Sequence, residues 1–355
     1  MIWALIAALA VALVAVERWW MPAALRVLHF RGESDKIMAE PGEKVTWRGT
    51  VENRSRMPVP FVRLRQSVPQ ECTLLQSERW QKSHLKLGVY QRYVEEKMAL
   101  RPWQSITREV SFSLPARGLY NIGAGWVSAG DLLGMEEGVK DTSGRPLVII
   151  PELSRQHKKL EAFSGFLGDV SVRRFILEDP ILTVGFRDYT GREPLKSVSW
   201  KRTAVAGKLQ VKQYDHTAEQ TATVLLDVDG ATGEVLEECF RLCRSVWQEL
   251  EKQKIPYGFR TNGNLPGPVC RLEALSDGPG KQHLDTILYA LGRANSTCFR
   301  NLDSLARQAL GTRKNNEAYI LITPQVTPQV QAVCRRLETT TGTPLCVLAA
   351  KEETA

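Results

Sequence analysis

Residues that commonly carry metal-binding or nucleophilic chemistry are few and scattered in this 355-residue sequence. Its five histidines stand far apart, so no HExxH-type zinc site is present. Its seven cysteines form no CxxC pair and no cysteine–histidine cluster at zinc spacing. An odd number of scattered thiols is typical of a reducing compartment. Cys239 and Cys243 are four positions apart on a predicted helix, so we expect both on one face and in the core.

Sequence motifs of hydrolases and nucleotide-binding enzymes are missing as well. There is no GxSxG elbow. The GPGKQ stretch resembles the end of a P-loop, but Leu275 stands where its first glycine is required and Gln282 where a serine or threonine is required. No acidic residue and histidine lie close enough in sequence to indicate a general acid–base pair. We therefore predict that the chain is not an enzyme and has no small-molecule substrate. An uncharacterised hydrolytic enzyme stays open as an alternative.

Charge is concentrated in one part of the chain. The formal net charge is +8, and residues 154–212 hold twelve Lys and Arg against six Asp and Glu. Such a basic surface suits nucleic acid, anionic lipid head groups or an acidic protein, and a solvated face beside a membrane is the plainer interpretation. Because no nucleic-acid recognition motif accompanies the charge, nucleic acid is not an expected partner.

The amino terminus contains the longest apolar run. Residues 2–16 carry no charge, and as a helix they would reach about 22 Å of the roughly 30 Å hydrocarbon core. Extension through Arg18, Trp19 and Trp20 would close that gap. A retained anchor is favoured over a cleaved signal peptide, because no basic residue precedes the run and no distinct cleavage site follows it. We therefore predict a transmembrane anchor and interface segment at 1–25, with the remaining domains in the cytoplasm because Lys and Arg follow the run.

Two further domains are indicated by the periodicity of the rest of the chain. Residues 35–151 alternate with period two and are broken by Pro, Gly and Asn at short intervals, which predicts an antiparallel β-sandwich without an interrupting helix. A polar connector is expected near 154–168. Strands and helices then alternate over 169–350, which predicts a doubly wound α/β domain. The expected fold class is α+β multidomain: transmembrane helix, sandwich, then α/β domain.

The most distinctive local pattern lies between Gly185 and Asp215. Read in order, the residues that form it are Gly185, Arg187, Tyr189, Gly191, Val198, Trp200, Thr203 and Ala204. Arg192 follows the second glycine, and Lys196 stands four positions later. With these residues the chain resembles a bacterial family known as "domain of unknown function 58". That family has Asp where this chain has Arg192, and Arg where it has Lys196. The stretch 117–135 is similar to the family's upstream segment, so the resemblance covers nearly the whole chain.

The resemblance implies that residues 169–350 form a domain like a von Willebrand factor A domain. Such domains bind Mg²⁺ through D-x-S-x-S at the end of the first strand, with later threonine and aspartate ligands. Here Asp227 matches, Asp229 replaces a serine, and Ala231 removes the second hydroxyl. Thr323 follows a later strand without a nearby aspartate. We therefore expect a vestigial site and no cofactor, with Asp227 and Asp229 holding Mg²⁺ loosely at most or one of them capping the following helix.

Two interpretations of Arg187, Tyr189 and Trp200 stay open. These residue types anchor many interfaces, so they could dock a partner together with the other motif residues, Gly185, Gly191 and Lys196. They could instead form a structural lock, with Trp200 buried and Arg187 paired to Asp188 or Asp215.

The resemblance implies a membrane-anchored, non-catalytic adaptor in the bacterial cell membrane. It also implies a MoxR-type AAA+ ATPase as partner in assembling or maintaining a complex. A divalent-cation-dependent, adhesion-type binding module is the alternative function.

Overall fold

The computed structural model describes most of the chain in two compact units. The described residues are 25–88, 92–130, 136–174, 183–191, 193–214, 221–266, 278–298, 300–311, 317–342 and 345–351, with residues 3, 6, 8, 11 and 15 before them. The first unit comprises Met1–Glu152 and Leu291–Arg293, and the second comprises Leu153–Ala290 and Ala294–Ala355.

The expected fold class is wrong in its first element, the transmembrane helix at 1–25. Among the described residues, no helix is long and apolar enough to cross a membrane. This finding overturns the predicted anchor and the single-pass location in the cell membrane that depended on it. The physical reason lies in the run itself, since its fifteen uncharged residues are fewer than the roughly 20 that a spanning helix needs. Most of residues 1–24 lie outside the described part of the chain.

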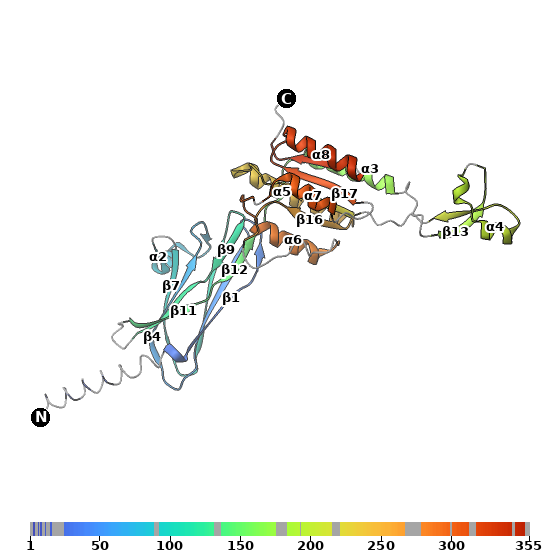
Figure 1. Ribbon diagram of the computed structural model, residues 1–355. Coiled ribbons are helices and arrows are strands. Elements are labelled where there is room, and N and C mark those ends of the chain that lie inside the picture. Colours follow the sequence, from blue (N-terminus) through green and yellow to red (C-terminus); the bar gives the residue numbers. More distant parts are fainter. Residues whose placement is uncertain are drawn as a thin grey trace. The chain divides into compact units, whose positions relative to one another are not determined.

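The first unit consists of short, mainly antiparallel sheets (Figure 1). One sheet has four strands, in the order β1 (Leu28–Ser34), β3 (Val45–Asn53), β8 (Ser105–Ser113) and β5 (Thr73–Leu74). A second has five, in the order β11 (Glu136–Thr142), β10 (Gly125–Gly130), β4 (Val59–Val68), β7 (Arg92–Leu100) and β6 (Leu85–Leu87). A third has three, in the order β2 (Met38–Ala39), β12 (Arg145–Ile149) and β9 (Gly118–Ile122).

Alternation of side chains explains the core of this unit. Along β3, Val45, Trp47 and Val51 are buried while Arg48 is exposed, because successive residues of a strand point to opposite faces. Trp47 pairs with Val110 of β8, and both belong to one buried apolar cluster. These strands lie within the stretch 35–151 whose period-two alternation predicts strands, and their buried faces follow that alternation.

A short helix, α2 (Glu78–His84), lies in the stretch where the sequence predicts no helix. Ser77 caps its first turn by accepting a hydrogen bond from the backbone N–H of Trp80. The helix buries no residue completely. It has no apolar stripe that periodicity could detect, and the cap is its main sequence signal.

The second unit is built on a four-stranded parallel sheet in the order β16 (Tyr257–Thr261), β15 (Thr221–Leu226), β17 (Glu317–Thr323) and β18 (Leu345–Ala349). Crossovers between parallel strands require intervening helices. These are α5 (Gly233–Lys252), α6 (Lys281–Arg293), α7 (Leu302–Gly311) and α8 (Pro328–Thr341). Within this unit β15 and β17 are central and apolar on both faces, apart from Thr221, Thr223 and the ends of β17.

Helix α5 confirms the prediction for residues 233–253. It buries a continuous apolar stripe, and Cys239 and Cys243 are completely buried within it, as expected from their spacing. Trp247, on the same face, meets Phe259 of β16 edge to face at 4.9 Å between ring centroids. This packing fixes α5 against one face of the sheet.

The predicted polar connector at 154–168 is instead the start of an 18-residue helix, α3 (His157–Arg174). Phe163 and Leu167 are its buried residues, four positions apart and therefore on one face. Just before the helix, the N–H of Ser154 donates to Ser245 Oγ at 2.9 Å, which ties the start of this segment to α5. The helix begins with His157, Lys158 and Lys159, and this polar start is why the sequence reads as a loop.

Residues 183–214 form a small segment that we call the hairpin segment. Strands β13 (Thr183–Asp188) and β14 (Gln210–Tyr214) pair antiparallel, and helix α4 (Trp200–Ala206) lies between them in the chain. Val198 and Val211 form an isolated bridge and are its buried apolar residues.

Candidate functional site

Three neighbouring strand ends bring polar side chains together in the second unit. Asp227 follows β15, Asn262 follows β16, and Thr323 ends β17. These strands are parallel and adjacent, so their carboxyl ends meet at one edge of the sheet, where ligand sites of α/β domains form. The backbone N–H of Asp227 donates to Ile322 O at 2.8 Å, which ties this loop to β17. We call Asp227, Asp229, Asn262 and Thr323 the strand-end site.

The Asp227 carboxylate accepts three hydrogen bonds from the protein. Asn262 Nδ2 donates to Asp227 Oδ1 at 2.7 Å, and the backbone N–H of Asp229 donates to the same oxygen at 3.1 Å. The Thr323 hydroxyl donates to Asp227 Oδ2 at 3.2 Å. Asn262 also accepts from the Val228 N–H at 3.0 Å. The carboxylate therefore links the ends of three strands through hydrogen bonds to a charged acceptor, which are stronger than neutral ones.

Burial controls the electrostatics of this carboxylate. Asp227 is 4% exposed, and this desolvation raises its pKa above the ordinary value, with a smaller contribution from the charge of Asp229. The hydrogen bonds from Asp229, Asn262 and Thr323 oppose the rise. The groups that donate to this carboxylate are all neutral.

The other positions of the motif provide little further ligation. Asp229 is exposed, and its carboxylate has no hydrogen-bond or ion-pair partner among the described residues. Ala231 is buried and offers only a methyl group where the metal-binding motif has its second hydroxyl. In the part of the chain that the structure describes, no group of three or more His, Cys, Asp or Glu side chains is arranged to hold a metal ion. The residues present fit a structural hub better than an octahedral Mg²⁺ site.

An open pocket of about 670 Å³ lies over the strand-end site. Its lining includes Asp227, Asp229 and Lys351, together with apolar side chains of α8. Asp303 also lines it but is already paired, at 2.5 Å with Arg307 Nη2 and also with Arg336. The predicted helix cap is not formed by the aspartates, because Thr232 occupies the N-cap position of α5.

The family-motif residues are all located in the hairpin segment. Gly185 and Arg187 lie on β13, Tyr189 follows it, and Gly191 forms the turn with φ +87°, a left-handed conformation that favours glycine. Arg187 Nη1 pairs with Glu193 Oε1 at 2.8 Å, and not with the predicted partner Asp188. Asp215 lies outside the described residues.

Glu193 organises the turn of the hairpin segment. The Thr190 hydroxyl donates to Glu193 Oε1 at 2.8 Å, and the Thr190 N–H donates to Oε2 at 3.1 Å. These bonds, with the charge of Arg187, lower the pKa of Glu193 to about 2. Sequence reasoning missed Glu193, although a T-G-x-E spacing across a turn is a usable signal.

Large apolar side chains are exposed in the hairpin segment. Trp200 is 66% exposed, which contradicts the predicted buried lock. Leu195 and Val205 are exposed as well, and Arg202 stacks over the Phe186 ring at 4.9 Å. Exposed aromatic and aliphatic residues in a short segment are typical of protein interfaces.

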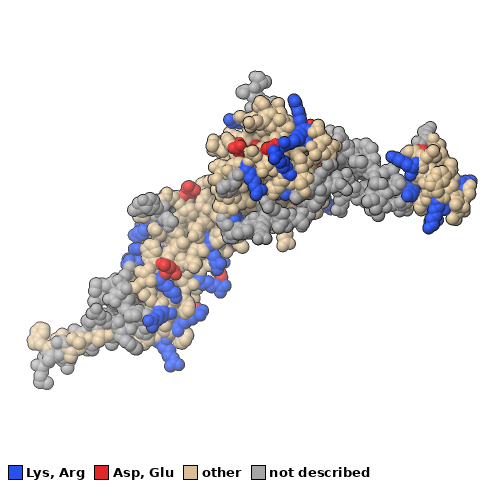
Figure 2. Space-filling view, viewed as in Figure 1, with Lys and Arg blue, Asp and Glu red and all other residues tan. Residues whose placement is uncertain are grey.

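Several cations accompany these apolar groups. Lys196, Lys201 and Lys208 are exposed and have no acidic partner among the described residues. Blue side chains accordingly stand out from the part that Figure 1 labels β13 and α4, with little red beside them (Figure 2). Lys196, the motif position at which the family has arginine, is therefore a free cation on the described surface.

The described thiols do not provide a nucleophile. Burial raises the pKa of Cys239 to about 12 and those of Cys334 and Cys346 to about 11. Because the thiolate is the reactive form, such thiols are inert near neutral pH. The structure thus offers the hydrolytic alternative no cysteine to use in these places.

Comparisons with known proteins give little. No protein-family model matches the sequence, and no curated protein is similar to it. A β-glucosidase from Erythrobacter marinus is 11% identical over 34% of this chain and 15% of its own, with a TM-score of 0.20. A cohesin–dockerin complex from Clostridium thermocellum is 10% identical over 34% of this chain and 99% of the matched chain, with a TM-score of 0.24. The sporulation control protein Spo0M from Bacillus subtilis is 12% identical over 46% of this chain and 58% of its own, with a TM-score of 0.21. Likeness at these scores carries no argument.

Proposed function

We propose that this protein is a non-catalytic adaptor that binds another protein through the hairpin segment. The observation that carries the proposal is the exposed Trp200, surrounded in sequence by exposed aliphatic residues and unpaired lysines. Burying such an indole on association removes a large apolar area from water, at about 25 cal/mol per Å². The lysines would complement acidic groups on the partner and speed its association.

A MoxR-type AAA+ ATPase is the partner class that we propose. This part of the proposal rests on the resemblance of the motif Gly185–Ala204 to the "domain of unknown function 58" family. Assembly or maintenance of a complex would then be the adaptor's task. The proposal requires an acidic surface on the ATPase, because the hairpin segment presents cations to its partner.

A divalent-cation-dependent binding module is the alternative, and the strand-end site argues against it. Asp227 is buried and already accepts three hydrogen bonds from the protein, and Ala231 supplies no hydroxyl, so few oxygen ligands remain for a cation. Asp229 alone would supply an unengaged carboxylate. We therefore propose that partner binding is independent of Mg²⁺.

Affinity purification of the tagged full chain from its own host tests the proposal. Parallel samples contain Mg²⁺ or EDTA, and co-purified ATPase is identified by mass spectrometry. We expect the ATPase in both samples, since the proposed surface contains no metal ligand. Recovery only with Mg²⁺ would contradict the proposal and favour the cation-dependent module.

A matched pair of tryptophan variants locates the binding surface. Trp200 and Trp103 are each 66% exposed, and Trp103 lies in the other unit. Trp200→Ala should reduce ATPase recovery at least about tenfold, as expected for an interface anchor. Trp103→Ala should leave recovery unchanged. Equal effects of the two substitutions would refute the assignment of the hairpin segment.

A further inference from the structure

Strand β18 is an open edge of the parallel sheet. In the part of the chain that the structure describes, it pairs with β17 on one side and with no strand on the other. An edge strand directs a row of backbone N–H and C=O groups away from its neighbour, and these groups can pair with an added strand. Natural proteins usually cover or blunt such an edge.

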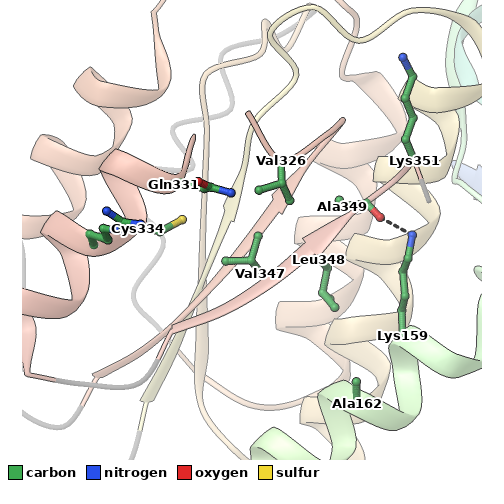
Figure 3. Close-up of a pocket in the computed structure, with 10 residues that line it drawn as sticks. Lys159, Ala162, Val326, Gln331, Cys334, Val347, Leu348, Ala349 and Lys351 are labelled. Atoms are coloured by element: carbon green, nitrogen blue, oxygen red, sulfur yellow. Dashed lines mark hydrogen bonds between the residues drawn. The ribbon is translucent and has the colours of Figure 1, made fainter. Parts of the chain in front are cut away.

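A groove of about 540 Å³ follows this edge (Figure 3). Helix α8 forms one wall and α3 the other, with β18 between them. Val347 and Leu348 both line the groove although neighbouring residues of a strand point to opposite faces, so the groove wraps around the strand's open side. Ala162 and Val326 add further apolar surface. Val347 is exposed in the groove whereas Leu348 is buried, so the apolar surface that β18 offers to an added strand lies mainly at Val347.

Charged groups of only one sign line the groove: Lys159, Arg335 and Lys351. Lys159 Nζ donates to Ala349 O at 2.5 Å and to Ala350 O at 3.4 Å, which holds its ammonium at the end of β18. Arg335 is exposed and has no acidic partner among the described residues. The groove thus combines apolar side chains, uncompensated positive charge and the edge of β18, where Lys159 already binds the Ala349 carbonyl at one end.

Other occupants fit this chemistry less well. Cys334 lines the groove, but burial raises its pKa to about 11, which disfavours covalent capture. No aromatic side chain lines the groove, so nucleic-acid bases would find nothing to stack on. A second copy of this chain, paired edge to edge, would bring two sets of cations together, at a cost that like charges impose on any interface.

We propose that β18 binds an extended, acidic segment of a partner protein, which adds to the sheet as a fifth strand. Backbone hydrogen bonds to β18 provide the affinity, as in other cases of strand addition. Acidic side chains of the segment meet Lys159, Arg335 and Lys351, and its apolar side chains contact Val347 and Ala162. This surface is separate from the hairpin segment, so it can succeed or fail whether or not the ATPase proposal holds.

Fluorescence anisotropy with synthetic peptides and the full chain tests the proposal. The probe is a labelled peptide of alternating valine and glutamate, and a valine–lysine peptide of equal length is the charge control. Two further probes carry N-methyl groups on alternate residues, one set on each edge of the extended peptide. We expect the acidic peptide to bind, the basic one not to bind, and only one of the two methylated sets to lose binding.

Charge-reversal variants connect the binding to the groove. Arg335→Glu should weaken binding of the acidic peptide about tenfold, since it reverses an interface charge. Lys281→Glu, an equally exposed reversal at the first residue of α6, should change it by less than about twofold because surface charges away from a contact contribute little. Circular dichroism checks that both variants fold. Hydrogen exchange of the Leu345–Ala349 amides should slow when the peptide is bound.

Several results would overturn the proposal. Equal binding of both methylated sets would mean that the peptide does not pair with an edge. Unchanged exchange of the β18 amides would place the binding elsewhere. A dimer in sedimentation experiments without peptide, with the same amides protected, would assign the edge to a second copy of the chain.

Discussion

Substitutions of Asp227 distinguish between two roles for its carboxylate, a structural one and that of a metal ligand. In Asp227→Ala the backbone N–H of Asp229 and the amide of Asn262 lose their acceptor, while the Thr323 hydroxyl can turn to Gln325 O at 3.4 Å. In Asp227→Asn the side-chain oxygen can still accept both bonds, and its amide can donate to Thr323 Oγ1. The two variants therefore differ in hydrogen bonding while both remove the charge.

The size of the effect follows from the donors that lose their acceptor. A buried donor without a partner costs about 1–3 kcal/mol, and water from the adjoining pocket reduces that cost. Two donors give a loss of about 2–4 kcal/mol for Asp227→Ala. In a domain of this size the melting temperature falls about 2–4 °C per kcal/mol, which gives a decrease of about 5–15 °C. Asp227→Asn should stay within about 1 kcal/mol of the parent, since its hydrogen bonds can be rebuilt.

The pH dependence gives this prediction a sign. Burial raises the pKa of Asp227 in the folded state, so its ionised form is disfavoured there relative to the unfolded chain. The parent should therefore lose stability relative to Asp227→Asn as pH rises from about 4, the unfolded carboxyl pKa, through the folded value. Below that pH interval Asp227 is protonated in both the folded and the unfolded chain, so the parent is least destabilised relative to Asp227→Asn. The difference in stability between the parent and Asp227→Asn cancels the titration of the other carboxyl groups.

Calorimetry of the full chain measures the shift, and hydrogen exchange of β15 and β16 peptides locates it in the second unit. A parallel titration with Mg²⁺ completes the assay. Equal stability of Asp227→Ala and Asp227→Asn would refute the role of Asp227 as a hub. A melting temperature of the parent that rises with Mg²⁺, but not in Asp227→Asn, would show that the site holds the ion.

Three other predictions concern separate parts of the chain. The pKa of Glu193, about 2, should appear as the midpoint of its carboxyl NMR titration. The hairpin turn should be fully ordered above pH 4.5 and should lose its order as the pH falls toward 2. A midpoint above 4 would contradict the hydrogen bonds from Thr190. Cys239 and Cys243 should react with a thiol reagent at pH 7.5 only after denaturation, because burial raises both pKa values; peptide mapping that finds them labelled in the folded chain would refute their burial. Gly123→Ala should cost about 2–4 kcal/mol in urea unfolding, because the new methyl would collide with the Trp47 ring and φ is +74°, whereas Gly42→Ala, with φ +77° and open space, should cost about 1 kcal/mol; equal losses would show that the Trp47 contact does not matter.

Long periodic segments of this sequence predicted their structures well, because burial itself generates the periodicity. Helix α5 shows its stripe of apolar residues plainly, and β3 alternates over its whole length. Helix α3 was missed because it begins with three polar residues and because, among its described side chains, Phe163 and Leu167 are the buried ones, too few to form a periodic stripe. At the amino terminus the sequence predicted a transmembrane helix that the described residues do not contain. Fifteen uncharged residues are fewer than the roughly 20 that a spanning helix needs.

Local sequence placed the strand-end site but could not complete it. Asp227 was found because it follows an apolar strand directly. Asn262 was missed because its contact depends on β16 lying beside β15, a neighbour relation between segments 35 residues apart. The exposure of Trp200 was likewise undecidable, because one motif residue reads the same whether it packs inward or faces a partner.

The same geometry explains why recognition should move away from the strand ends. In a parallel sheet the carboxyl ends normally leave polar groups free for a ligand. Here Asp227 uses both oxygens to connect β15 with β16 and β17, and Asp229 is the one carboxylate of the motif left open among the described residues. The two surfaces that we propose for binding lie elsewhere, at the exposed Trp200 with its neighbouring lysines and at β18, which is an edge strand among the described residues. Because an amide at position 227 can preserve the hub, Asp227→Asn should leave binding at both of those surfaces intact, and loss of either would show that the strand ends still take part in recognition.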